Sequence, residues 1–456
     1  MFARRDFLKI MATGSLAVGC QAFFPRAWGA AASSKYFAIK DIKRTTVKLP
    51  YRPAPERAMD RELPHWRWIE IFEVKLGSGK VGIGETLLHY TWGVTEDDDV
   101  KSAMGKNAVE IMWDDSIGAG LQMAIFDAVA RTAEVPVHRL LGDQVHQTTP
   151  LSWWNIDTSV EDMASECRQA YKEGYLAYKT KGRPWFDLWK QVEAAVAVVP
   201  PEFKIDMDFN GTLLDARRGL PILLDLERHE HIDIYESPIP QVDVEGNRKI
   251  TDATRVGVAL HYGTPSPQVC VRERVCDGFV IGGGAQRTMA RGLTCGQVDL
   301  PFWLQLVGSG ITAAFSLHFG AVLSHARWPA VNCHQLYAAN LLTQPIVVQK
   351  GRADVPDVPG LGYDLDRDVM EKYRVDKPKK RPDPPRLIMT TWPDGRRMYY
   401  GSGDAVGRVN FVLHTAIDGE IPYYERGVDT KLVPNDGSDE WQRLYLKARE
   451  KPFLVK

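Results

Sequence analysis

The sequence predicts an α/β chain in which a small α+β domain is followed by a (β/α) barrel and then by an additional C-terminal segment. Strand-like and helix-like tracts alternate after Pro150, and polar residues stand where the predicted strands end. The spacing is regular: 27 residues separate Lys181 from Asp208, 28 separate Asp208 from Glu236, and 25 separate Glu236 from His261. Such a repeat accommodates one strand, one helix and two short loops, the unit of a (β/α) barrel.

Composition excludes several classes of function. The chain has 456 residues, 44% of them hydrophobic, and a formal net charge of −1 without a long basic run. Nucleic acids and anionic membranes require a cationic surface, so neither is expected as the main partner. No stretch after residue 30 approaches the roughly 20 apolar residues that span a bilayer, so no stable membrane span is expected. With these partners excluded, a small-molecule substrate is the expected partner.

The N-terminus, residues 1–34, has the order of features of an export signal. Arg4 and Arg5 begin the run RRDFLK, an apolar stretch covers residues 10–24, and small residues follow at 27–32. The run resembles a twin-arginine leader, which implies an exported, periplasmic protein. Two alternatives are a lipid anchor at Cys20 and a mildly amphipathic first helix.

The first folded domain is expected over residues 35–150. Residues 68–76 alternate between apolar and polar positions as a strand does, turn at Gly77–Lys80, and return through residues 81–85. Residues 117–141 form a helical tract that stops at Val135–Pro136 and Gly142.

The barrel is expected over residues 151–345, and its strand ends carry the candidate site. Alternate residues of a strand share a face, so Lys179 and Lys181 point the same way. Two neighbouring ammonium groups raise the cost of charging either one, which can leave one lysine as a base near neutral pH. Asp208 and Asn210 share a face of the next strand, and Glu236 ends the one after. Carboxylates from two neighbouring strand ends form an oxygen site that suits Mg²⁺.

Several sequence motifs, taken in their order along the chain, resemble the motifs of one protein family. They are a Lys-x-Lys strand at 179–181, an Asp-x-Asn strand at 208–210, a Glu-x-Pro strand at 236–238, and capping-domain motifs at 82–86 and 124–142. The chain resembles the mandelate racemase and muconate-lactonizing branch of the enolase superfamily. The resemblance implies an α+β capping domain and a modified TIM-type (β/α)7β barrel, with residues 346–375 returning to the capping domain.

The resemblance also implies proton abstraction next to a carboxylate, with a divalent metal stabilising the enediolate. By position, Lys181 is the expected base and Lys179 tunes it or binds the carboxylate. Asp208 and Glu236 are the expected metal ligands, and Asn210 supports them. Mg²⁺ is the metal that the family implies.

The sequence departs from this family pattern at three positions. His261 stands where a third acidic ligand is usual, which would favour Mn²⁺, Fe²⁺ or Zn²⁺; alternatively, His261 is a general acid. The Asp of the family's Asp–His dyad should fall near Ile281–Gly284, where no acidic residue stands, and Gln305 occupies the position of the dyad histidine, so the second base is missing. The run Gly282–Gly284 is expected either to bind an anion or to form a tight turn. Separately, His318 and His325 are expected to lie on a helix surface or to pack inside the fold.

The expected function is therefore a metal-assisted lyase or dehydratase acting on a sugar acid or a related polyhydroxylated compound. Trp153, Trp154, Asn155 and Gln305 are expected to bind substrate. An epimerase or cycloisomerase using Lys181 and His261 is one alternative, and a non-catalytic exported binding protein is another. Members of the family commonly assemble, so a homo-oligomer is expected. Residues 376–456 form a C-terminal extension with a predicted hairpin at 387–392 and 396–400.

Overall fold

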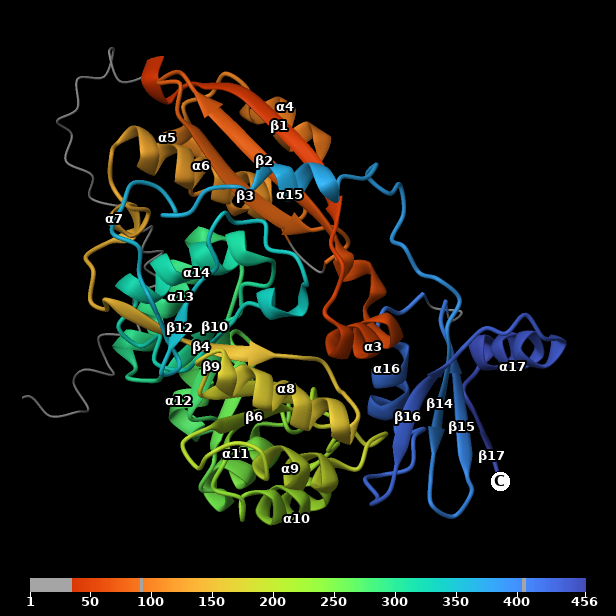
Figure 1. Cartoon of the computed structure of the whole chain (residues 1–456). Coiled ribbons are helices and arrows are strands. Elements are labelled where there is room, and N and C mark those ends of the chain that lie inside the picture. Colours follow the sequence, from red (N-terminus) through yellow and green to blue (C-terminus); the bar gives the residue numbers. More distant parts are fainter. Residues whose placement is uncertain (1–34, 91–92, 404–406) are drawn as a thin grey trace, which may run out of the picture.

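The computed structural model describes residues 35–90, 93–403 and 407–456. The predicted export signal and Cys20 lie outside the described residues. Figure 1 shows three parts: a capping domain above, a barrel below it, and the C-terminal extension to one side. In the described part of the chain, no helix is long and apolar enough to cross a membrane.

The capping domain is an antiparallel three-stranded sheet with one helix packed against it. The strands β1 (Ile39–Lys48), β2 (Trp68–Leu76) and β3 (Val81–Leu87) are adjacent in sequence order. The helix α6 (Ala119–Thr132) approaches β3 so closely that a Cβ atom at Gly84 would lie 2.1 Å from the carbonyl oxygen of Gly120. The predicted strands are confirmed, and the predicted helical tract is divided, since α7 (His138–Leu141) follows a break at Pro136. The remaining elements are α3 (Pro53–Glu62), η1 (Pro64–Arg67), α4 (Asp97–Ala103), α5 (Ala108–Ile111) and η2 (Asp115–Ile117).

The barrel is confirmed as a closed ring of eight parallel strands, (β/α)7β. Seven of them pair in sequence order, and the short eighth strand pairs with the first. A bridge between Gln305 and Val331 joins the seventh strand to the eighth and closes the ring. The strands are β4 (Thr148–Trp154), β5 (Ala177–Lys181), β6 (Lys204–Asp208), β7 (Ile232–Glu236), β8 (Gly257–His261), β9 (Gly278–Ile281), β10 (Phe302–Leu304) and β11 (Ala330–Val331).

One helix follows each of the first seven barrel strands and covers the outside of the ring. These helices are α8 (Val160–Lys172), α9 (Leu188–Val196), α10 (Ala216–Leu226), α11 (Val244–Ala253), α12 (Pro267–Glu273), α13 (Ala285–Gln297) and α14 (Gly310–Val322). After η3 (His334–Leu336), β12 (Val348–Gln349) and β13 (Arg352–Asp354) add an antiparallel edge to β4. The chain then returns to the capping domain at α15 (Arg367–Lys372), where Lys48 N donates to Tyr373 O.

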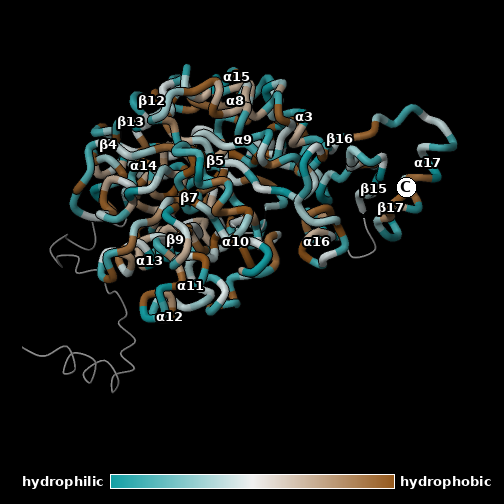
Figure 2. The backbone as a smooth tube through the Cα atoms, turned by 90° about the horizontal axis from the view of Figure 1, so that it is seen from below, coloured by the Kyte–Doolittle hydropathy of each residue, from teal (hydrophilic) through white to brown (hydrophobic). Residues whose placement is uncertain are grey.

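The extension has its own four-stranded antiparallel sheet. The predicted hairpin is confirmed as β14 (Leu387–Thr391) and β15 (Arg397–Gly401). Strands β16 (Asp429–Val433) and β17 (Phe453–Val455) complete it in the order β16-β14-β15-β17, with helices α16 (Phe411–Ile417) and α17 (Asp439–Glu450). Seen from below in Figure 2, β15, β17 and α17 project to one side of the barrel, and α16 lies nearer to it.

Two carboxylates of the capping domain cap helices of the barrel. Glu85 is buried and accepts hydrogen bonds from Ser309 N at 2.6 Å and Thr312 N at 2.8 Å at the start of α14. Asp115 accepts from the backbone amides of residues 286 and 287 at the start of α13, both at 3.0 Å. The carboxylates satisfy amides that have no partner inside the helix and complement the positive end of its dipole. They therefore orient the capping domain over the barrel.

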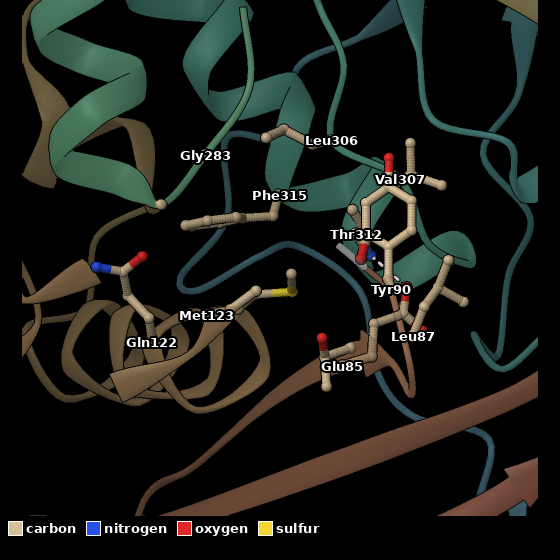
Figure 3. Close-up of a pocket in the computed structure, with 13 residues that line it drawn as sticks. Glu85, Leu87, Tyr90, Gln122, Met123, Gly283, Leu306, Val307, Thr312 and Phe315 are labelled. Atoms are coloured by element: carbon tan, nitrogen blue, oxygen red, sulfur yellow. Dashed lines mark hydrogen bonds between the residues drawn. The ribbon is translucent and has the colours of Figure 1, made fainter. Parts of the chain in front are cut away.

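This interface also settles the role of the glycine run. Gly282–Gly284 lead directly into α13, whose first amides bind the Asp115 carboxylate rather than a ligand. Figure 3 shows the narrow pocket beside these glycines, with Gln122 and Met123 of α6 facing Phe315 of α14. The run is thus a turn at the interface between the capping domain and the barrel.

Buried histidines join the capping domain to α14 a second time. His318 is fully buried, and its ring stacks on that of His138 with the ring centroids 5.7 Å apart. Its Nδ1 accepts from His138 N at 3.2 Å, and its Nε2 lies 3.2 Å from Leu361 O. Burial lowers the pKa of His318 to about 3, so the ring is neutral. Of the two roles left open for His318, the structure shows packing.

We expect Glu85→Ala to lower the free energy of unfolding by about 3 kcal/mol, because it leaves buried amides of α14 without an acceptor. Asp215→Ala is the matched control. Asp215 caps α10 of the barrel with the same chemistry, but its side chain is 42% exposed, so its loss should cost about 1 kcal/mol. Urea unfolding measures both. Equal costs for the two variants would contradict the anchoring role of Glu85.

We expect acid to destabilise the protein partly through His318. Its pKa is about 3 in the folded chain and about 6.5 when unfolded, so the unfolded state binds the extra proton between these values. His318 therefore lowers the free energy of unfolding as the pH falls from about 6.5 towards 3. His318→Gln should flatten this dependence in urea unfolding at a series of pH values, whereas the exposed His414→Gln should not. Identical pH profiles for wild type and His318→Gln would refute the assignment.

Candidate active site

The candidate site lies where β5, β6 and β7 end. In the strand register, Lys181 stands beside Asp208, and Asp208 stands beside Glu236. One residue row across three parallel strands thus carries one lysine and two carboxylates. Lys179, two residues before Lys181, lies one layer deeper in the barrel beside Asp206.

Lys179 is the buried cation of the site. Its ammonium forms an ion pair with Glu236 and lies 4.0 Å from Asp208 Oδ2. It also donates to Gln305 Oε1 at 3.3 Å and lies 4.9 Å from the centre of the Trp303 ring. These partners compensate the loss of water around a lysine that is 1% exposed.

Lys181 lies closer to the pocket surface. Its ammonium contacts Asp208 Oδ2 at 2.5 Å and Asn210 Oδ1 at 3.2 Å. Arg183, two residues further, binds the same Asn210 oxygen at 2.6 Å. The side chain of Lys181 is 15% exposed, compared with 2% for Lys179, so Lys181 can be reached by a ligand.

Burial and neighbouring charges give the two lysines opposite shifts. Burial lowers the pKa of Lys181; Asp208 opposes this only in part, and the charges of Lys179 and Arg183 lower the pKa further. Burial also acts to lower the pKa of Lys179, but Glu236 and Asp208 outweigh it, and the pKa is raised. Burial would raise the pKa of Glu236, yet Lys179 and His261 hold it below its usual range. Lys181 is therefore the more easily deprotonated lysine.

Asp206 differs from Glu236 in the direction of its pKa shift. Its side chain is buried, and burial together with Asp233 raises its pKa well above the usual range. Among the described residues its Oδ1 has no hydrogen-bond partner. The raised pKa favours the neutral carboxyl, which stands beside Lys179 in the strand register, one layer deeper than Asp208.

His261 touches the site from outside the pocket. Its Nε2 lies 2.9 Å from Glu236 Oε1, and its side chain is 46% exposed. Its backbone N–H donates to Gln241 Oε1 at 2.9 Å, which fixes the end of β8. His261 does not line the cavity that contains Lys181. The structure thus places it behind Glu236, as a neighbour of the carboxylate.

The residues as arranged do not fit a divalent metal. Asp208 and Glu236 supply carboxylate oxygens from adjacent strands, but the ammonium of Lys179 lies between them. Among residues 35–90, 93–403 and 407–456, no three His, Cys, Asp or Glu side chains are grouped so as to hold a metal ion. Lys179 supplies positive charge at the carboxylate pair. Metal binding stays a prediction from the sequence.

The pocket is formed by all three parts of the chain. It holds a cavity of about 190 Å³, which suits a small metabolite. The capping domain contributes aromatic and apolar side chains, the barrel contributes the charged floor, and the extension contributes one side. The lining residues are Glu62, Leu63, Trp66, Tyr90, Trp154, Ile156, Asp157, Lys179, Lys181, Arg183, Trp185, Asn210, Gln305, Val307, Val331, Cys333, Asn410 and Leu413.

The structure separates the predicted substrate-binding residues into two pairs. Trp154 and Gln305 line the pocket, and Trp154 stacks on Trp66 with ring centroids 5.7 Å apart. Trp153 instead points to the helix side, where its Nε1 donates to Glu166 at 2.9 Å, as alternation along β4 requires. Asn155 is fully buried, does not line the pocket, and accepts through Oδ1 from Ile156 N.

Several lining residues were missed by sequence reasoning. Arg183 and Trp185 follow the Lys-x-Lys strand within four residues, so their position beside it was a usable signal. Trp66 comes from the capping domain and Asn410 from the extension. No local pattern marks either of them, because only the packing of the domains brings them to the barrel.

Comparison with known proteins agrees with this architecture. Residues 162–369 match the family model described as enolase C-terminal domain-like. The chain is 23% identical over 374 residues to arabinonate dehydratase of Saccharolobus solfataricus, covering 74% of this chain and 99% of that one. It is 22% identical to N-succinyl-L-Arg/Lys racemase of Bacillus cereus over 272 residues, covering 56% and 71%. The family match runs from α8 to α15 and covers most of the barrel.

Solved structures show the same fold over the capping domain and the barrel together. Muconate cycloisomerase from Pseudomonas fluorescens superposes with a TM-score of 0.60 at 18% identity, covering 75% of this chain and 99% of that chain. An enolase from Mycobacterium smegmatis complexed with tartrate gives 0.60 at 16% identity, covering 74% and 91%. At these identities the two structures show the fold; support for the enolase superfamily comes from the family match over residues 162–369.

We expect Lys179 to compete with divalent metals for Asp208 and Glu236. Lys179→Gln removes the ammonium between the carboxylates and should increase the affinity for Mn²⁺ or Mg²⁺ at least about tenfold, the effect of roughly 1.4 kcal/mol. Calorimetric titration of the purified protein measures the affinity. Lys204→Gln, at the opposite end of the neighbouring strand β6, is the control and should leave it unchanged. Tight metal binding by wild type that Lys179→Gln leaves unaltered would contradict the competition.

Proposed function

We propose that this chain is an enolase-superfamily enzyme that removes the proton next to the carboxylate of a small polyhydroxylated acid and then eliminates water. The observation that carries the proposal is the contrast between the two lysines. Lys179 is locked in an ion pair with Glu236, whereas Lys181 reaches the pocket with a lowered pKa. The class of the matched relatives supports catalysis, and the dehydratase among them supports this reaction type.

The residues of the pocket provide each role in that reaction. Arg183 and Lys179 place positive charge at the floor of the pocket, where the substrate carboxylate and the developing enediolate carry negative charge. Neutral Lys181 accepts the α-proton through Nζ. The resulting Lys181 ammonium then donates a proton to the departing β-hydroxyl group, which leaves as water. The lysine returns to its neutral form, and the enol product rearranges to a 2-keto acid.

The positions of His261 and Gln305 favour elimination over racemisation. Racemisation requires a second base on the opposite face of the substrate, and Gln305 cannot serve as a base. His261 lies outside the pocket, behind Glu236. One lysine working on one face is sufficient for abstraction and elimination. The export predicted from residues 1–34 completes the proposal: the enzyme acts outside the cytoplasm.

We expect the wild-type protein to dehydrate a suitable aldonic acid. In D₂O, the α-hydrogen signal of the converted acid should disappear from the proton NMR spectrum, and a 2-keto acid should form. Lys181→Met should abolish both changes, because Lys181 is the proposed base and the lining carboxylates of Glu62 and Asp157 are paired with Arg61. Lys204→Met is the matched control, since it changes a lysine at the far end of β6. Full activity of Lys181→Met would refute the proposal.

The same experiment separates the alternatives. Deuterium in the recovered substrate or in an isomer of it, without loss of water, would identify an epimerase or cycloisomerase. Tight binding of sugar acids without any exchange or turnover would identify a binding protein. Either result would replace the dehydratase proposal.

A further inference from the structure

The C-terminal extension is attached to the loop that follows the two lysines. Tyr424 donates through its hydroxyl to Gly182 O at 3.0 Å, directly after Lys181. Thr430 Oγ1 donates to Trp185 O at 2.6 Å, and Gly427 N donates to Asp187 Oδ2 at 2.7 Å. The extension therefore holds residues 182–187 along their whole length.

Apolar packing strengthens this attachment. Trp185 and Phe186 are each 1% exposed and belong to a core that is otherwise built from the extension. The remaining members of this core are Ile388, Trp392, Met398, Tyr400, Phe411, Val412, Ala416, Ile421 and Val428. Burial of two large aromatic side chains contributes several kcal/mol, so the extension is a fixed part of the barrel mouth.

The extension also contacts the capping domain. Arg386 is 5% exposed and donates through Nη1 to the carbonyl oxygens of Arg61 at 2.6 Å and Glu62 at 3.2 Å, at the end of α3. Leu63 and Trp66, which follow α3, line the pocket. The extension thus joins the two pocket walls that come from the capping domain and from the β5 loop.

Two residues of the extension reach the cavity itself. Asn410 and Leu413, at the start of α16, line the pocket that contains Lys181. The Asn410 Oδ1 atom is buried and has no hydrogen-bond partner among the described residues. A buried carbonyl oxygen without a partner costs about 1–3 kcal/mol, which a ligand donor can recover.

We propose that the extension is the specificity wall of the active site, with Asn410 accepting a hydrogen bond from a substrate hydroxyl group and Leu413 closing the cavity beside it. The inference rests on the proposed function in that the substrate is a hydroxylated acid. Lys179 and Arg183 bind the carboxylate end, and Asn410, from a different part of the chain, binds a hydroxyl further along. The preferred substrate is an acid long enough to contact both. The family model ends at residue 369, before the extension begins.

Binding of two acids of different length tests the role of Asn410. Calorimetry on the full-length mature protein uses gluconate, which has six carbons, and lactate, which has three. Asn410→Ala should weaken gluconate binding about fivefold, the value of one hydrogen bond, and leave lactate binding unchanged. Asn435→Ala, an exposed asparagine of the same extension, is the control. Unchanged gluconate binding by Asn410→Ala, or an equal loss for both acids, would overturn the hydrogen-bond assignment.

A second measurement does not depend on the substrate. Cys333 lines the cavity and is 1% exposed, so its alkylation by iodoacetamide reports how well the wall seals it. Leu413→Ala should raise the labelling rate of Cys333 about fivefold or more, since the lost carbon atoms open the wall. Leu446→Ala, on the exposed side of α17, should not. Labelling of the Cys333 peptide is followed by mass spectrometry.

The two measurements distinguish failure of the wall from failure of the function. An unchanged labelling rate in Leu413→Ala would overturn the wall, whatever the protein binds. If neither acid binds to wild type, the proposed sugar-acid function is wrong and the role of Asn410 falls with it. Faster labelling of Leu413→Ala would still support the closing role of the extension in that case.

Discussion

The ion pair between Lys179 and Glu236 is the interaction on which the candidate site depends. Both side chains are almost completely buried, and each would be strongly unfavourable without the other. The pair keeps Lys179 in its charged form, and Asp208 forms its close ion pair with Lys181 instead. The strand register supports this division, because Lys181, Asp208 and Glu236 occupy one row across three parallel strands. One lysine thereby becomes a permanent charge and the other is available for proton transfer.

Carboxylates also organise the molecule around this site. Glu85 and Asp115 of the capping domain bind the first amides of two barrel helices, and these contacts set the position of the capping domain. Trp66 and Tyr90 then lie over the barrel mouth. On the other side, the extension holds the loop that follows Lys181. The pocket therefore lies where the capping domain, the barrel and the extension meet.

Sequence reasoning succeeded where the relevant interactions are local. The 25–28 residue rhythm predicted the barrel because each βα unit has nearly the same length. Alternation predicted β2, and the turn at Pro393–Gly395 predicted the β14–β15 hairpin. The motif order also placed Lys181, Asp208 and Glu236 together. It was less informative for Trp153 and Asn155, since the face of β4 that points inward depends on the packing of α8 and on the barrel shear. It also left the role of His261 open, and the structure places this side chain outside the cavity.

The sequence by itself determined the fold class, the order of the domains and the two lysines, because periodicity and spacing are properties of consecutive residues. Only the tertiary structure decided how those lysines are paired. The ammonium of Lys179 lies between Asp208 and Glu236, and the extension supplies Asn410 to the pocket from more than 200 residues along the chain. Contacts of this kind depend on which surfaces pack together. No local pattern encodes them, so they follow from the folded chain alone.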